Sequence, residues 1–235
     1  MSNTSIGLAK KGSKYQMQRL TLKENLHYLN RKIGESLTWL SPVKEEEFRE
    51  YQLNNKKISK RLDLNENAFI DFWPSRQSQW DGIAIGESGT LYLFEAKSHM
   101  SEIQPGKEGK SEENNHLKYN SIMLIAKETF GIQSSVETQN IWCKRYYQIS
   151  NRIAFQQKLI QLSKDSNAFN NVVMVFLNFV NDRTWLSDNK MVYTSDEWDN
   201  HYNCILSQMG INRESLAQFN SSVDAHPVTT AEYST

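Results

Sequence analysis

The chain has 235 residues, of which 38% are hydrophobic, so it can bury a substantial core, and we expect one domain between residues 14 and 220. Lysine plus arginine and aspartate plus glutamate both total 27, which excludes a globally basic protein that coats nucleic acid. No apolar run approaches the roughly 18 residues that span a membrane. The two cysteines are too far apart to suggest a zinc motif. A cytoplasmic protein without a membrane partner is therefore expected.

Any contact with nucleic acid must use local patches of positive charge, because the net charge is zero. Three such patches lie at residues 10–14, 56–61 and 107–118. For any single patch, an ordinary solvated face or loop is the favoured interpretation.

Hydropathy patterning predicts a largely helical first part of the chain. We expect a flexible start over residues 1–13 and helices over 14–33 and 43–53. A connecting loop over 54–66 and an edge strand over 67–73 should follow. The second helix would begin after Ser41-Pro42 with an acidic first turn. Pro74 would end the strand.

Two apolar runs flank a Gly-Glu-Ser-Gly turn, a combination that indicates a β-hairpin over residues 81–97. A turn centred on Ser88 predicts three opposed pairs: Ile85 with Leu91, Ile83 with Leu93, and Asp81 with Glu95. Opposed residues have Cβ atoms about 4.5–5.5 Å apart. Lys97 follows Glu95 by two residues and points to the same face. Two carboxylates and one amine therefore meet at one end of the hairpin.

This set of two acids and a lysine suits metal-assisted phosphodiester hydrolysis. Two carboxylates this close repel unless a cation lies between them, and Mg²⁺ or Mn²⁺ is the expected occupant. Lys97 would add positive charge where a phosphate oxygen or attacking water becomes negative, and burial can lower its pKa toward that of a general base. The alternative is an ordinary cross-strand ion pair. The apolar residues on both faces of these strands argue against it, because buried sheets rarely keep three charged side chains without a function.

The rest of the chain alternates loops, helices and strands. We predict a charged loop over residues 99–113, followed by helices over 116–130 and 141–162. A central buried strand over 171–180 and a short strand over 191–193 come next. A final helix over 198–209 and a flexible tail over 221–235 complete the prediction. The loop is either a substrate-gripping excursion or a mobile connector. The long helix before the buried strand favours a parallel neighbour for that strand.

Four polar residues are candidates for contact with substrate. Gln148, Asn151 and Arg152 share one side of the 141–162 helix and could bind a phosphate if this helix packs against the sheet. Hydrogen bonds between helices are the equally open alternative. Gln79 shares strand parity with Asp81 and could reach the same site, or it could serve only the turn.

Asp81, thirteen intervening residues and Glu95-Ala96-Lys97 resemble the signature of the PD-(D/E)xK nuclease superfamily. Trp80 stands where the name of the motif has Pro, a departure that leaves the acid in place. Further spaced motifs resemble an uncharacterised bacterial branch: Trp39-Leu40-Ser41-Pro42, Glu50-Tyr51, Phe72-Trp73-Pro74, Trp80-Asp81-Gly82, Tyr147-Gln148-Ile149-Ser150-Asn151-Arg152 and Phe179-Val180-Asn181-Asp182.

The resemblance implies an α/β, restriction-endonuclease-like core: a central mixed β-sheet, with the hairpin carrying the site, flanked by helices. It implies a Mg²⁺-dependent, deoxyribonuclease-like enzyme. Asp81, Glu95 and the backbone oxygen of Ala96 would hold the metal, and Lys97 would orient or deprotonate the attacking water.

In such nucleases the helix before the hairpin often supplies one more acid. Glu50 is the candidate for this supporting role, Glu47 is the competing choice, and a solvated helix residue is the plain alternative. The expected partner is nucleic acid, with DNA favoured and a homodimer as a further candidate assembly. The second functional hypothesis is a nuclease-fold protein that binds nucleic acid or a protein partner without cutting.

Overall fold

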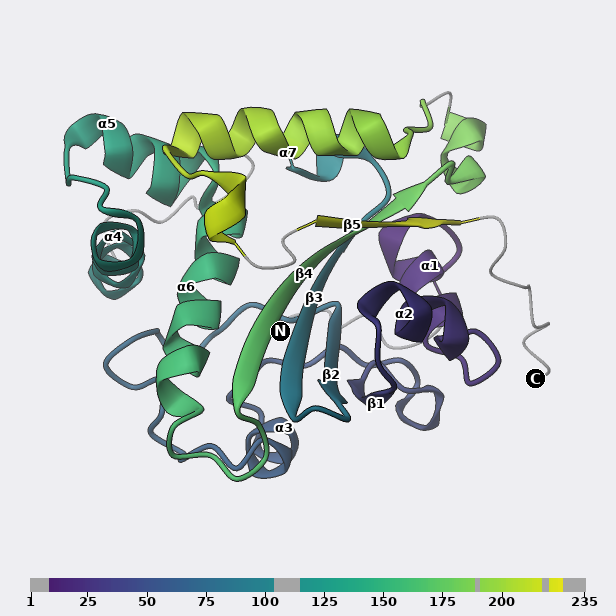
Figure 1. Ribbon diagram of the computed structural model, residues 1–235, viewed down its shortest axis with the longest axis horizontal. Coiled ribbons are helices and arrows are strands. Elements are labelled where there is room, and N and C mark those ends of the chain that lie inside the picture. The colour runs from purple at the N-terminus through teal and green to yellow at the C-terminus, as the bar shows by residue number, and fades with distance from the viewer. Residues whose placement is uncertain (1–8, 104–114, 189–190, 217–219, 226–235) are drawn as a thin grey trace.

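The computed structural model describes residues 9–103, 115–188, 191–216 and 220–225. Within these ranges five strands form one sheet, in the order β1 (Leu37–Ser41), β2 (Gly82–Gly86), β3 (Thr90–Lys97), β4 (Asn171–Val180) and β5 (Asn220–Asp224). β1, β2 and β3 are antiparallel neighbours, whereas β4 runs parallel to β3 and β5 parallel to β4. The expected α/β class, with a mixed sheet flanked by helices, is confirmed (Figure 1).

Helices cover both faces of this sheet (Figure 1). The α-helices are α1 (Gly12–Leu20), α2 (Leu26–Ile33), α3 (Lys56–Arg61), α4 (His116–Phe130), α5 (Val136–Gln139), α6 (Tyr147–Leu162) and α7 (Ser195–Met209). Short segments of tighter or wider helix are η1 (Lys44–Glu46), η2 (Met100–Ile103), η3 (Asn140–Arg145), η4 (Arg183–Asp188) and η5 (Arg213–Ser215). α4, α6 and α7 contribute to the apolar core on one face, and α1 and α2 to the core on the other.

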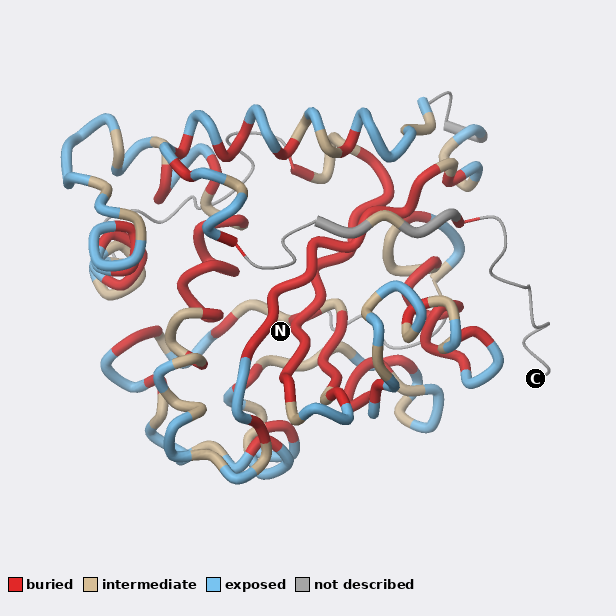
Figure 2. The backbone as a smooth tube through the Cα atoms, in the orientation of Figure 1, coloured by how far each residue is buried: buried red, intermediate tan, exposed pale blue. Residues whose placement is uncertain are grey.

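β3 lies at the centre of the sheet and is buried along its whole length (Figure 2). Because side chains alternate along a strand, Leu91 and Leu93 join the core beneath α6, while Tyr92 and Phe94 join the core beneath α1. The hairpin register is confirmed: Ile83 lies opposite Leu93 and Ile85 opposite Leu91. The strand that carries Glu95 and Lys97 is therefore shielded from water on both faces.

Two predicted elements in the first half are wrong because tertiary contacts override local patterning. The expected 43–53 helix is only the η1 turn, since the next two residues, Glu47 and Phe48, take positive φ angles of 53° and 54°. That reversal buries Phe48 and lets Tyr51 form an isolated antiparallel bridge with Trp80. The expected strand at 67–73 is a series of turns.

Other boundaries also differ from expectation. The 14–33 helix is broken into α1 and α2 by a turn in which the side chain of Asn25 donates to the carbonyl of Arg19. β1 and α3 were not anticipated, and residues 191–193 are not a strand.

The later elements follow their sequence signals more closely. α4 and β4 match their predicted ranges, and β4 has the expected parallel neighbour. α7 begins with a capping box at Thr194 and ends at Gly210, whose φ is 72°. β5 falls within the stretch expected to be a flexible tail, and residues 226–235 lie outside the described part of the chain, as do most of the 99–113 loop and residues 1–8.

Phe155 of α6 holds the irregular 67–80 segment against the sheet. Its ring centroid lies 4.9 Å from that of Trp73, 5.4 Å from Phe72, 5.6 Å from Phe69 and 6.3 Å from Trp80. This aromatic cluster positions the residues that lead directly into Asp81.

We expect Phe155→Ala to lower the free energy of unfolding by about 3–5 kcal/mol, because it leaves a cavity where four aromatic rings meet. Urea unfolding followed by tryptophan fluorescence measures this loss. Leu124→Ala, at a residue that is 53% exposed on α4, is the matched control and should change stability little. Equal losses in the two variants would contradict the central role of the cluster.

Candidate active site

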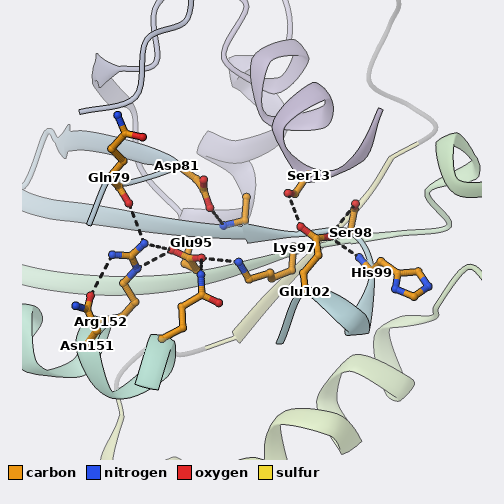
Figure 3. Close-up of polar contacts among 12 residues, drawn as sticks. Ser13, Gln79, Asp81, Glu95, Lys97, Ser98, His99, Glu102, Asn151 and Arg152 are labelled. Atoms are coloured by element: carbon orange, nitrogen blue, oxygen red, sulfur yellow. Dashed lines mark hydrogen bonds and ion pairs between the residues drawn. The ribbon is translucent and has the colours of Figure 1, made fainter. Parts of the chain in front are cut away.

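Asp81, Glu95 and Lys97 converge where β2 begins and β3 ends (Figure 3). Asp81 immediately precedes β2, and its Oδ2 accepts a hydrogen bond of 2.7 Å from the backbone N–H of Ala96. Glu95 and Lys97 point to one face of β3, and the Lys97 ammonium lies 2.5 Å from Glu95 Oε1. The structure therefore brings together the three residues that the hairpin pattern predicts.

Glu95 is an acid whose two carboxylate oxygens are fully engaged by the protein. Its side chain is almost completely buried. Oε1 accepts from Lys97 and from Gln148, each at 2.5 Å, and Oε2 accepts from Nε of Arg152 at 2.6 Å. Burial opposes ionisation of this carboxyl, but the nearby guanidinium of Arg152 and ammonium of Lys97 outweigh it and hold the pKa of Glu95 below its usual value.

Arg152 links α6 to the segment that leads into β2. Its Nη2 donates to the backbone carbonyl of Gln79 at 2.8 Å, and its Nη1 donates to Oδ1 of Asn151 at 3.2 Å. The guanidinium also lies over the indole of Trp80, with its central carbon 4.3 Å from the ring centroid. One buried side chain thus fixes Glu95, Gln79 and Trp80 relative to one another.

The candidate substrate-binding residues therefore contact Glu95 or its partner Arg152 and do not form an open surface. Gln148 and Arg152 bind Glu95, and Asn151 is buried beside Arg152. Gln79 offers its carbonyl to Arg152, and its side-chain nitrogen donates to the carbonyl of Glu50 at 3.4 Å. Contact of these residues with a phosphate stays a prediction.

Asp81 is electrostatically the opposite of Glu95. Burial, and after it the negative charges of Glu95 and Glu50, raise the pKa of Asp81 to about 8, although Lys97 and the N–H of Ala96 act in the other direction. Lys97 therefore compensates the charged form of this carboxyl only in part. A divalent ion bound there would supply that compensation.

Lys97 differs from the expectation of a lowered pKa. Burial does act to lower it, but the negative charges of Glu95, Asp81 and Glu102 outweigh burial, and the pKa of Lys97 lies above its usual value. The expected shift toward a general base is therefore wrong. Lys97 is a buried, permanently charged ammonium that can stabilise negative charge.

Glu50 reaches the site from an extended segment instead of the expected helix. Its Oε1 lies 3.3 Å from the ammonium of Lys14, on α1. Because its charge contributes to the raised pKa of Asp81, Glu50 fits the supporting role better than Glu47, which is exposed in the left-handed turn after η1.

The sequence analysis missed the contribution of α1 to the surroundings of the site. The carboxylate of Glu102 accepts from the backbone N–H groups of Ser98 and His99, both at 2.8 Å, and from the hydroxyl of Ser13, also at 2.8 Å (Figure 3). With the contact between Lys14 and Glu50, this places α1 against two acids, one of which acts electrostatically on Asp81 and the other on Lys97. Residues up to 13 resemble a flexible terminus in sequence, so no local signal could reveal this contact.

The donor set fits a divalent cation in part. Asp81 Oδ1 makes no hydrogen bond within the described residues, and only the flexible side chains of Lys97 and Gln148 contact Glu95 Oε1. Across the same residues no cluster of three or more His, Cys, Asp or Glu side chains forms a ready-made metal centre. A metal site made of Asp81 and Glu95 therefore requires the side chains of Lys97 and Gln148 to move away from Oε1 of Glu95.

Comparison with known proteins adds no family to this description. No family model matches the chain, and no curated protein or solved structure is significantly similar to it. None of the helices in the described ranges has the length and apolar character needed to cross a bilayer.

Asp81 predicts a specific pH dependence of stability in the absence of divalent metal. The pKa of Asp81 is about 8 in the folded protein and 3.8 in its ordinary state, so the unfolded chain releases this proton at lower pH. The free energy of unfolding therefore falls as pH rises between these two values. The melting temperature of wild type, relative to that of Asp81→Asn, should therefore decrease between about pH 5 and pH 8. Parallel melting profiles for the two proteins would contradict the assignment.

Removing Arg152 should leave Glu95 buried with an incompletely balanced charge. We expect Arg152→Met to cost about 3 kcal/mol of unfolding free energy, measured by urea denaturation. Adding Glu95→Gln to this variant should restore a large part of the loss, because the charge that needs a partner is gone. Additive losses in the double variant would show that Arg152 stabilises the fold by packing alone.

Proposed function

We propose that this chain is a Mg²⁺- or Mn²⁺-dependent phosphodiesterase that hydrolyses nucleic acid, DNA in the first instance, with a restriction-endonuclease-like core of PD-(D/E)xK type. The observation that carries the proposal is the convergence of Asp81, Glu95 and Lys97 at one end of the hairpin, where the neighbouring acids help to raise the pKa of Asp81. An acid whose charge is only partly compensated, next to a second acid and a fixed ammonium, suits metal-assisted chemistry on a phosphate. The hairpin with a parallel β4 beside it is compatible with this core.

Asp81 and Oε1 of Glu95 would hold the metal, with the backbone oxygen of Ala96 as a third ligand. When bound, such an ion polarises a phosphate oxygen and lowers the pKa of a coordinated water. Lys97 keeps its proton and stabilises the negative charge that develops on the phosphate. Arg152 holds Glu95 in place without touching the reacting atoms. Glu50, at the edge of the site, assists by accepting a hydrogen bond from the attacking water.

A second candidate function is binding of nucleic acid or of a protein partner without cleavage. The observation that favours it is the saturation of Glu95, whose charge the protein already balances with Arg152 and Lys97. In that case the ion pair between Glu95 and Arg152 would be purely structural, and Asp81 would remain protonated at neutral pH. The two functions differ in what divalent metal does to the protein.

Cleavage of single-stranded, double-stranded and branched DNA, and of RNA, with Mg²⁺ or Mn²⁺ tests the proposal directly. Wild type should cut at least one substrate, and Lys97→Met should lose activity by about 10²-fold or more, because it removes the charge that stabilises the transition state. Lys164→Met, at an exposed lysine beyond α6, is the matched control and should retain activity.

Metal-dependent thermal stabilisation separates the two functions. The first predicts a rise in melting temperature with Mn²⁺ that Asp81→Asn abolishes, since an ion bound only to the folded state stabilises it. No rise in wild type and no cleavage of any substrate would favour the non-cutting protein.

A further inference from the structure

An open polar groove of about 400 Å³ lies between η1 and α3, beside the candidate active site. Glu50 and Gln79 form the part of its wall nearest to that site. Gln79 is bonded through its carbonyl to Arg152, and the charge of Glu50 acts on Asp81. The groove therefore shares two of its wall residues with the surroundings of the candidate active site.

Two cationic side chains, those of Arg49 and Lys56, lie in the wall of this groove. Arg49 and Lys56 are both exposed, and neither side chain makes an ion pair or hydrogen bond with any residue in the described ranges. Their neighbours differ: Lys57 pairs with Glu46, and Lys14 pairs with Glu50. Positive charge without an internal counter-ion is thus concentrated at the groove, as a binding site for phosphate groups requires.

A second hollow, of about 230 Å³, adjoins the groove and shares Asn54 with it. Its wall includes Ile70, an apolar side chain that is 65% exposed, and the buried Trp73. It also includes Gln77, which is 4% exposed. Gln77 accepts from the backbone N–H of Asn54 at 3.2 Å, while its side-chain nitrogen has no hydrogen-bond partner among the described residues.

These features match the two halves of a nucleotide. A nucleobase is planar, has apolar faces and carries acceptors on its edge, so it can lie on Ile70 and accept a hydrogen bond from Gln77. The phosphates on either side of that base would lie toward Arg49 and Lys56. Only an unpaired base can enter the hollow, because a base in a duplex is stacked and paired.

We propose that the groove and the hollow are consecutive subsites for one unpaired strand of nucleic acid, with phosphates beside Arg49 and Lys56 and a base beside Ile70 and Gln77. The proposal rests on the proposed function for the site to which the groove leads. It narrows the substrate class to single strands, or to duplexes with a single-stranded end or flap.

Fluorescence anisotropy with a labelled oligothymidylate of about 20 nucleotides, in EDTA so that no cleavage occurs, tests the groove. Arg49→Ala/Lys56→Ala should bind about 10- to 100-fold more weakly than wild type near 100 mM salt. Its slope of log affinity against log salt should be smaller by about 1.4, which corresponds to two phosphate contacts on a single strand. Arg31→Ala/Lys32→Ala, which removes the same charge from α2, is the matched control and should bind as wild type does.

Two substrate comparisons test the unpaired base without altering the protein. A duplex of the same length should bind more weakly than the single strand, and an abasic strand about tenfold more weakly than oligothymidylate. Preference for the duplex, equal binding of the abasic strand, absence of binding, or unchanged binding by the groove variant would each overturn the proposal.

Failure of this proposal is distinguishable from failure of the proposed function. If wild type binds the strand through the groove but cuts nothing with Mg²⁺ or Mn²⁺, the subsites stand and the nuclease assignment fails. If wild type cuts and the groove variant binds and cuts equally well, the nuclease assignment stands and the subsites fail.

Discussion

The buried pair formed by Glu95 and Arg152 is the interaction on which the organisation of the site depends. A carboxylate at the end of β3 loses its hydration when α6 covers it, and only a partner with several donors can compensate. Arg152 does this while also binding the carbonyl of Gln79 and stacking on Trp80. The central strand, the covering helix and the segment before β2 are consequently held by one side chain.

This arrangement gives two neighbouring acids opposite properties. Arg152 and Lys97 both contact Glu95, so Glu95 is charged and fixed, whereas burial and two negative neighbours outweigh the effect of Lys97 on Asp81. Lys97 lies between the two acids electrostatically and keeps its charge because of both. The two acids differ in pKa, which is raised for Asp81 and lowered for Glu95. This difference, more than the presence of two acids and a lysine, makes the site a candidate for cation-assisted chemistry.

Local sequence signals predicted the parts of the fold that local interactions determine. The hairpin register, β4, α4 and the end of α7 at Gly210 follow from alternation, helical spacing and glycine. The segment around Glu50 and the 67–73 stretch could not be predicted, because burial of Phe48 and the rings around Phe155 decide their paths. The hairpin pattern likewise placed Asp81, Glu95 and Lys97 together. It could not reveal that Arg152 and Gln148 would donate hydrogen bonds to the carboxylate of Glu95.

The separation of Glu95 from Arg152 along the chain has a consequence for biosynthesis. Asp81 finds its N–H donor only 15 residues away, whereas Glu95 finds Arg152 after 57. At about 5–20 residues per second, a ribosome makes the hairpin roughly 3–11 s before Arg152 exists. Closing the end of β3 during that interval would bury Glu95 with Lys97 but without its guanidinium partner. The nascent hairpin therefore has to keep Glu95 in water until α6 has been synthesised, which makes docking of that helix the step that completes the site.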